Sequence, residues 1–134
     1  MRQRGFTLLE VLIAIALMGI GLAGLMAMHS TMTRANRTSS DLAAASSAGQ
    51  ATLESLRTRS VAALEADFGP LPITATLPDV DSEAGVTLAR EIEIAAVPST
   101  TDLYRMRVHV SWSESGGGQR DVAFELMVHH PSAP

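Results

Sequence analysis

The chain has no cysteine and no lysine, and its 134 residues include one tryptophan, one tyrosine and three phenylalanines. Without cysteine it forms no disulfide, no thiolate metal site and no thiol redox centre. All ten basic residues are arginine and stand against fourteen acidic residues, which gives a formal net charge of −4 at pH 7. A net acidic chain is a poor candidate for nucleic-acid binding, which depends on basic patches, so we expect no nucleic-acid partner.

Charge is also nearly absent from one long segment near the N-terminus. A short basic leader, Met1–Gly5, precedes the apolar run Phe6–Met28, which is 23 residues long and contains Glu10 as its single ionisable residue. As an α-helix this run is about 34 Å long, which suits a hydrocarbon core of about 30 Å. A secretory signal has a shorter apolar core of about 7–15 residues. The run therefore predicts one membrane span, with Arg2 and Arg4 on the cytoplasmic side.

Glu10 is the unusual residue of this segment. A charged side chain inside a hydrocarbon layer costs several kcal/mol, so it is rare there and usually has a specific partner. One interpretation is that the carboxylate pairs with a positive group in the same apolar environment, which removes most of the cost of burying either charge alone. The alternative is that Glu10 is protonated in the membrane or reaches the interface.

The segment Arg4-Gly-Phe-Thr-Leu-Leu-Glu10, followed by the apolar run, resembles the class III signal of type IV prepilins and pseudopilins. The resemblance implies that a membrane-embedded prepilin peptidase cuts between Gly5 and Phe6 and methylates the new amine of Phe6. It also implies that Glu10 is the assembly glutamate of the family. In that role its carboxylate pairs with the Phe6 amine of a neighbouring subunit and fixes the axial register.

Helical character continues beyond the apolar run, because His29–Ala66 contains no proline and only one glycine, Gly49. We therefore expect one helix to about residue 66, ended by the segment Gly69–Pro72. The Ser- and Thr-rich segment Ser30–Ser40 has weaker helix propensity and leaves a local break as an alternative. Asp41 is expected to lie off the apolar face. Residues of helical spacing form that face: Leu42, Ala45, Gly49, Leu53, Leu56 and Ala63.

A loop is expected over about residues 67–85, with an optional short strand near Ile73–Leu77. Its acidic part, Asp79–Gly85, lacks the EF-hand spacing and is interpreted as a solvated turn rather than a calcium site. Alternating apolar residues then predict three antiparallel strands over about residues 86–130. The connections are Val97–Asp102 and the glycine-rich Ser113–Gln119.

Each predicted strand has one apolar side. These sides are Val86, Leu88, Ile92 and Ile94 (together with Arg90), then Tyr104, Met106, Val108, Val110 and Trp112, then Val122, Phe124, Leu126 and Val128. On the opposite side, Arg105 and Arg107 are expected to form cross-strand pairs with acidic residues of the neighbouring strands. The candidate acids are Glu91, Glu93 and Glu125.

The expected fold is α+β: a long N-terminal α-helix, transmembrane in its first half, packed on a small three- to four-stranded antiparallel sheet. Its expected parts are a leader (1–5), a membrane and assembly half of the helix (6–28) and an extracytoplasmic domain (29–134). The pilin resemblance implies the same layout. The segment Tyr104–Trp112, a glycine turn and Arg120–Leu126 are similar to the C-terminal part of PilV-type minor pilins and GspI-type pseudopilins.

Catalysis has no support in the sequence. The histidines His29, His109, His129 and His130 do not form a convergent metal-ligand pattern, and neither a nucleophile elbow nor a glycine-rich phosphate loop is present. We therefore predict no catalytic residue, no metal site and no cofactor.

The resemblance implies a minor pilin that primes or caps assembly of a type IV pilus. Many type IV pilins have a disulfide-closed C-terminal loop, and the lack of cysteine favours a minor over a major subunit. The alternatives are a minor pseudopilin of a type II secretion system and a single-span membrane protein whose external domain binds a ligand without polymerising.

The implied partners are other minor and major pilins or pseudopilins, prepilin peptidase, the assembly platform protein and the inner membrane. The implied location is the bacterial inner membrane, with the C-terminal domain in the periplasm, and later the pilus or pseudopilus.

Overall fold

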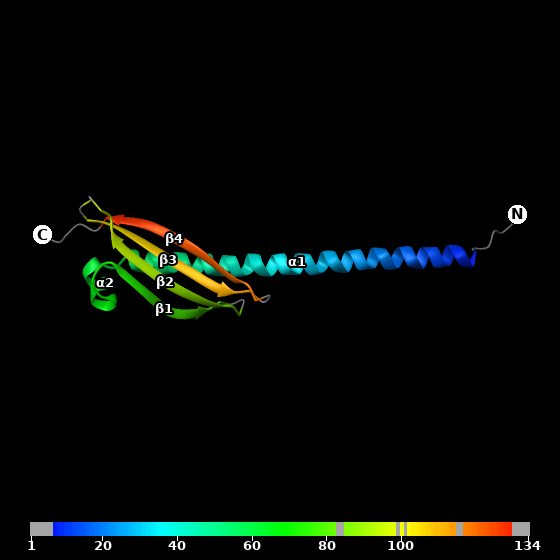
Figure 1. Cartoon of the computed structure of the whole chain (residues 1–134), viewed down its shortest axis with the longest axis horizontal. Coiled ribbons are helices and arrows are strands. Elements are labelled where there is room, and N and C mark those ends of the chain that lie inside the picture. Colours follow the sequence, from blue (N-terminus) through cyan, green and yellow to red (C-terminus); the bar gives the residue numbers. More distant parts are fainter. Residues whose placement is uncertain (1–6, 83–84, 99, 101, 115–116, 130–134) are drawn as a thin grey trace. The chain divides into compact units, whose positions relative to one another are not determined.

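The computed structural model describes residues 7–82, 85–98, 100, 102–114 and 117–129. The chain divides into two units, residues 1–38 and 39–134, each of which is considered by itself. The elements follow one another along the chain as two helices and then four strands (Figure 1). They are α1 (Leu8–Arg57), α2 (Val61–Phe68), β1 (Ile73–Asp81), β2 (Thr87–Ala96), β3 (Leu103–Ser113) and β4 (Gln119–His129).

Helix α1 is continuous through the Ser- and Thr-rich segment, so the alternative of a local break there is wrong. The hydroxyls of Ser30 and Thr31 donate to the carbonyl of Ala27 at 2.8 and 3.1 Å, and Thr33 donates to the carbonyl of His29 at 3.0 Å. These side chains therefore bond to the preceding turn of the helix and do not compete with its backbone ladder.

The predicted end of the helix near residue 66 is also wrong, because α1 ends at Arg57 and α2 is a separate helix. Ser60 has extended backbone angles and its hydroxyl accepts from the backbone N–H of Ala63 at 3.3 Å, so it is the N-cap of α2. Arg59 and Asp67 form an ion pair between the turn and α2. The break between the two helices thus occurs at a serine N-cap, in a segment that contains no proline.

The four strands form one antiparallel sheet in the order β1-β2-β3-β4, which confirms the predicted meander and settles the number of strands. The optional strand near Ile73–Leu77 is present as β1, which extends further, to Asp81. The expected loop over residues 67–85 is therefore wrong, and Asp79 and Asp81 belong to the strand. A register shift between Leu77 and Val80 absorbs Pro78 and Asp79, so the strand continues past residues that do not alternate. Glu83 of the predicted acidic loop lies outside the described residues.

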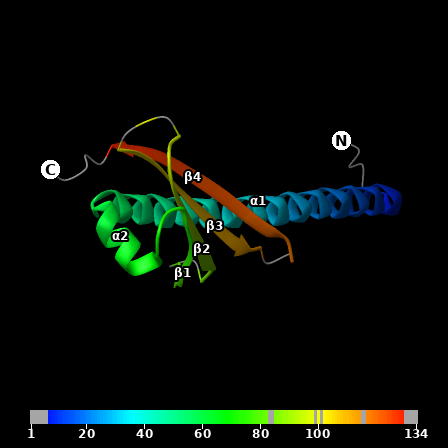
Figure 2. The same cartoon turned by 60° about the vertical axis from the view of Figure 1, so that its left-hand side comes forward.

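One face of the sheet, here called the inner face, packs against the C-terminal part of α1 (Figure 2). The central strands β2 and β3 supply most of the core, in the alternation expected from the sequence. The buried apolar residues are Leu88, Ile92, Ile94, Met106, Val108, Val110 and Trp112 from these strands, with Ile73, Leu64, Ala45 and Leu56 from the elements around them.

The side of α1 that packs on the sheet is more polar than the spacing of the apolar residues in the sequence predicted. Asp41 and Thr52 are 8% and 4% exposed, whereas Leu42, which was expected on the buried face, is 46% exposed. Arg90 of β2 explains the burial of Thr52, because its Nη1 donates to the Thr52 hydroxyl at 3.1 Å and its Nη2 donates to the carbonyl of Pro78 at 2.7 Å. Arg90 thus connects α1 to the irregular part of β1 between Leu77 and Val80.

Gly49 lets α1 approach β4 closely. A Cβ placed on Gly49 would lie 2.3 Å from Cε2 of Phe124, which is far shorter than any normal carbon–carbon contact. The Phe124 ring therefore occupies the space that a side chain at position 49 would need. The contact between Gly49 and the Phe124 ring therefore sets how closely the helix approaches the sheet.

We predict that Gly49→Ala destabilises the protein. Overpacking typically costs about 1–3 kcal/mol, while the better helix propensity of alanine returns about 1 kcal/mol, so a net loss of up to about 2 kcal/mol is expected. Unfolding of the full chain in detergent, followed through the fluorescence of the buried Trp112, measures the change.

The control is the same substitution in the Phe124→Leu background, where the ring that clashes is gone and the added loss should be smaller. Equal losses in both backgrounds would contradict a steric contact between positions 49 and 124.

Candidate functional site

The N-terminal part of α1 has an apolar surface that nothing in its own unit covers. In residues 8–38 every side chain is exposed except Thr38, which is half-buried. The most apolar 18-residue stretch of α1 is 0% buried, and α1 is the one helix of the described residues that is long and apolar enough to cross a membrane. The large apolar side chains run on from Leu8, which is 81% exposed, to Met32, at 54%. Such a surface is stable in lipid or against other apolar helices.

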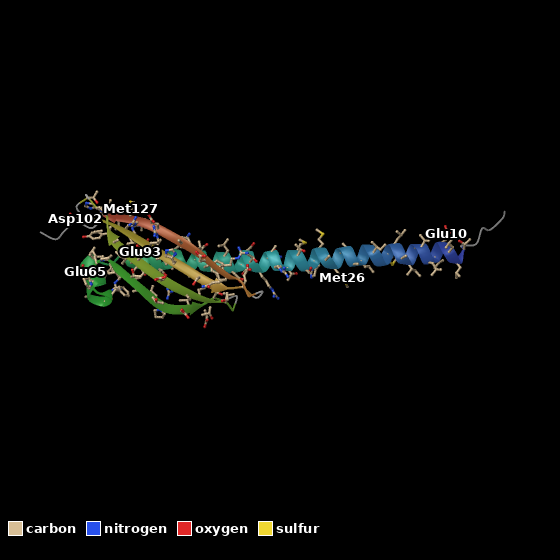
Figure 3. The ribbon with its side chains drawn as sticks, viewed as in Figure 1. Glu10, Met26, Glu65, Glu93, Asp102 and Met127 are labelled. Atoms are coloured by element: carbon tan, nitrogen blue, oxygen red, sulfur yellow. The ribbon has the colours of Figure 1, made fainter. Side chains whose placement is uncertain are left out.

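Glu10 lies in the first turn of α1 with its side chain exposed (Figure 3). The hydroxyl of Thr7 accepts from the backbone N–H of Glu10 at 3.3 Å, so Thr7 caps the helix. The sequence Thr7-Leu-Leu-Glu10 has the spacing of a capping box, in which the acidic residue also favours the helix N-terminus. Sequence reasoning missed this local role, although the spacing of Thr7 and Glu10 was visible.

The other two predicted site residues, Gly5 and Phe6, lie outside the described residues. Their predicted cleavage, and the pairing of Glu10 with the new amine, remain predictions that the fold of the chain does not test.

The sheet face opposite α1, here called the outer face, carries an ion-paired ladder across three strands. Arg107 of β3 donates to Glu125 of β4 at 2.6 Å from Nη2 and at 3.1 Å from Nε, and to Glu93 of β2 at 3.3 Å from Nη1. These three residues are direct cross-strand neighbours in the sheet register. The predicted pairing of Arg107 with Glu93 and Glu125 is therefore confirmed.

The ladder shifts the titration of its members. The hydrogen bond from Arg107 is the main cause that lowers the pKa of Glu125; partial desolvation opposes it, and the charges of Arg107 and Arg105 lower it further. The hydrogen bond to Glu125 in turn raises the pKa of Arg107. All these groups are partly exposed, so their contribution to stability is modest and sensitive to salt.

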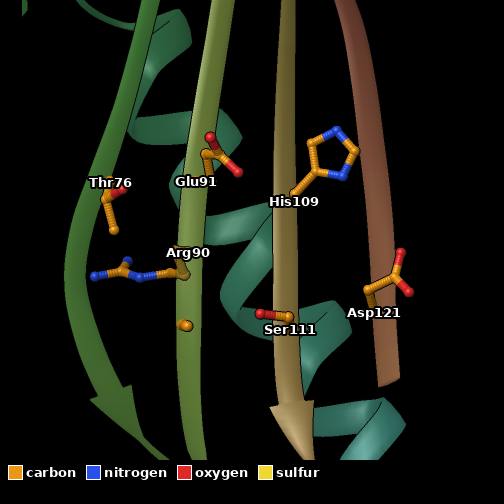
Figure 4. A pocket seen from close by; sticks show the side chains of 7 residues that line it. Thr76, Arg90, Glu91, His109, Ser111 and Asp121 are labelled. Carbon is orange, nitrogen blue, oxygen red and sulfur yellow. The ribbon is translucent and has the colours of Figure 1, made fainter. Parts of the chain in front are cut away.

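A shallow, open hollow lies beside the ladder on the same face (Figure 4). Glu91 stands directly opposite His109 in the sheet register, and Ser111 stands opposite Asp121. Residues of all four strands line this hollow: Thr76, Ala89, Arg90, Glu91, His109, Ser111 and Asp121.

The described histidines come from three different elements. His29 is on α1, while His109 and His129 are on β3 and β4, and His130 lies outside the described residues. Within the ranges that the structure describes, no group of three or more histidine, aspartate or glutamate side chains is arranged to hold a metal ion.

Among known protein families, the model of the prokaryotic N-terminal methylation motif matches residues 1–26 of this chain. The match covers the basic leader, Gly5, Phe6, Glu10 and most of the apolar run. No curated protein and no solved structure matches the chain. The comparisons therefore concern its N-terminal segment, and the outer face and the hollow have no counterpart in them.

We predict that Glu125→Gln makes the free energy of unfolding fall less steeply as the pH is lowered. Because the pKa of Glu125 is lower in the folded state, its contribution is present above its ordinary value of 4.5 and is lost as the pH falls through the folded-state pKa. Chemical unfolding of the full chain in detergent at a series of pH values below 5 measures the slope of the free energy of unfolding against pH.

In the Arg107→Met background, the same substitution should change the slope much less, because the main cause of the shift is gone. An acid slope that Glu125→Gln leaves as steep as in the unmodified chain would contradict the role of the ladder.

Proposed function

We propose, from the type IV pilin and pseudopilin signal that this chain carries at residues 1–26, that the protein is a minor pilin. In this role it primes or caps the assembly of a type IV pilus and is a structural subunit rather than an enzyme. The observation that carries the proposal is the combination of this signal with an apolar helix whose surface is uncovered from Leu8 to Met32.

The first step is processing. Prepilin peptidase cleaves between Gly5 and Phe6 at the cytoplasmic face of the inner membrane, removes the leader with Arg2 and Arg4, and methylates the amine of Phe6. The cut places a cationic amine four residues before Glu10, at the start of the apolar helix. The domain that begins in the later part of α1 stays in the periplasm.

The second step is the transfer of the helix from lipid to protein. The exposed side chains of α1 contact lipid tails before assembly and the helices of neighbouring subunits after it, so they are buried in both states. The platform protein and the other pilins are the partners of this step.

Glu10 directs the second step. In an apolar surrounding, its carboxylate is stable when it pairs with the amine of Phe6 from a neighbouring subunit. The pair also fixes how far one helix is displaced along the next. Capping of the helix by Thr7 and Glu10 is a local role, which a single subunit needs as well. Because glutamine can also serve in a capping box, substitutions can remove the charge of Glu10 and the cap separately.

The lack of cysteine in these residues supports a minor over a major subunit. A pseudopilin of a type II secretion system uses the same processing and the same helix, and the destination of the subunit separates the two. Recovery in sheared pili supports the minor pilin, while recovery only with a secretion machinery supports the pseudopilin.

We predict that the chain recovered from membranes begins at N-methylated Phe6. Intact-mass measurement and N-terminal sequencing detect this start directly, and a Gly5→Val variant should keep Met1 because the cleavage residue is lost. A functional protein that retains its five-residue leader would overturn the proposal and would favour a single-span protein that does not polymerise.

We predict that Glu10→Gln inserts into the membrane normally but enters filaments at least tenfold less, since removing one partner of a buried ion pair costs about 3–5 kcal/mol. Glutamine still satisfies a capping box, so the change removes the charge alone. Immunoblots of the membrane fraction and of sheared pili measure insertion and incorporation.

Thr7→Ala is the matched control, because it removes the capping hydroxyl and keeps the carboxylate. It should enter filaments almost as well as the unmodified chain. If Thr7→Ala fails to assemble while Glu10→Gln assembles, the role of Glu10 is local capping and the proposed pair is wrong.

A further inference from the structure

The two edges of the sheet differ in their protection against another strand. At one edge, β1 contains Pro78, which has no backbone N–H, and its register shifts between Leu77 and Val80. Asp79 and Asp81 add charge to the same part of the strand. Proline, bulges and charge are the features by which natural sheets block pairing at an edge.

Strand β4, at the other edge, carries charged residues as β1 does but has neither the proline nor the register shift. All of its 11 residues pair with β3 in one unbroken register, from Leu103 opposite His129 to Ser113 opposite Gln119. The strand contains no proline and no glycine. Within the part of the chain that the structure describes, no strand lies along its free side (Figure 1). The backbone N–H and C=O groups that point to this side fit an extended strand.

The inner-face side chains of β4 also leave apolar surface uncovered. Val122, Leu126 and Val128 are only half-buried, whereas Met106, Val108 and Val110 of the neighbouring strand are 0% exposed. On the outer face, Met127 is 56% exposed. An added strand with apolar side chains towards the helix would cover the row that β4 leaves half-open.

The side chains of β4 on the outer face, here called its outer row, indicate which charge a partner strand would carry. Glu125 is already paired with Arg107, while Asp121 has no ion pair among the described residues and lies at the rim of the hollow (Figure 4). A basic side chain on an added strand would sit beside Asp121, with room in the hollow next to Ser111. Asp121 and Glu125 have the same sign, and no arginine lies in this row of β4. The one basic side chain of this row is His129, at the last position of β4, so a second β4 strand supplies no arginine to pair with Asp121.

We propose that the free edge of β4 binds an extended strand of a different pilin-type subunit, apolar on its helix side and basic where it passes Asp121. This inference rests on the proposed function, since the neighbour is another subunit of the same assembly. Main-chain hydrogen bonds to β4 give the contact its affinity, and the charge beside Asp121 gives it selectivity. The α1 helix joins the subunit to the filament, and the β4 edge selects its neighbour in the assembly.

The lack of cysteine makes a direct test straightforward, because one introduced cysteine is the sole attachment point in the chain. Ala123→Cys and Met127→Cys place it on the exposed outer row of β4, and Thr74→Cys places it on the exposed outer row of β1 as a control. Each full-length variant is produced in cells with a short photoreactive label, irradiated, and analysed by mass spectrometry of the cross-linked peptides.

The expected adducts join Ala123→Cys and Met127→Cys to one segment of another pilin subunit. Moving the label by four positions should move the partner residue by four, which is the signature of a paired strand. Thr74→Cys should give no such adduct. Adding Asp121→Asn should lower the yield about two- to fivefold, as expected for an exposed charge pair worth about 0.4–1 kcal/mol.

The remaining outcomes overturn the proposal in distinguishable ways. Adducts between two copies of this chain would identify a second copy as the occupant. Adducts without a common register, or equal yields at Thr74→Cys, would exclude strand addition. Incorporation into filaments without β4 adducts would refute the edge contact alone, and failure to incorporate at all would refute the proposed function together with it.

Discussion

The apolar surface of α1 between Leu8 and Met32 constrains everything else that this protein does. Its side chains are exposed in the chain by itself, from the first turn of the helix onwards. At about 25 cal/mol per Å² of apolar surface, leaving such a helix in water would be far more costly than the typical stability of a small domain. The helix therefore requires an environment that the chain does not supply. In the function proposed above, lipid supplies it before assembly and neighbouring helices supply it afterwards.

The same helix meets a different requirement where it covers the sheet. There the buried residues of α1 include small, polar and apolar side chains, from Ala45 and Thr52 to Leu56. The close approach depends on Gly49 facing the Phe124 ring. Arg90 adds a polar connection that links Thr52 of α1 with the bulge of β1. Between Leu8 and Met28, α1 is apolar on all sides apart from Glu10, whereas its C-terminal part packs on the inner face of the sheet.

The elements that depend on local pattern were predictable from the sequence. Strands β2, β3 and β4 follow period-two alternation, so their bounds, faces and connections agree with expectation, and the pairing of Arg107 with its two acidic neighbours follows from the register. The class III signal was equally readable, because Gly5, Phe6, Glu10 and the apolar run stand in a fixed order. These features lie within short windows of sequence.

The rest depends on contacts between distant residues. The N-cap role of Ser60 was hidden because no proline marks the break, and β1 appeared too short because Pro78 and Asp79 interrupt its alternation. The burial of Thr52 needs Arg90 from a strand 38 residues away. Neither the hollow nor the contrast between the β1 and β4 edges is visible until the order of the strands is known.

A spin label on a single cysteine, Met18→Cys, tests the central claim most directly, because the chain has no other cysteine and Met18 lies in the exposed apolar part of α1. In membranes the label should collide with lipid-soluble oxygen and be shielded from a water-soluble relaxation agent. In isolated filaments it should be immobilised and shielded from both. A label that the water-soluble agent reaches in membranes, or that stays as mobile in filaments as in lipid, would contradict a helix that passes from the bilayer into a protein core.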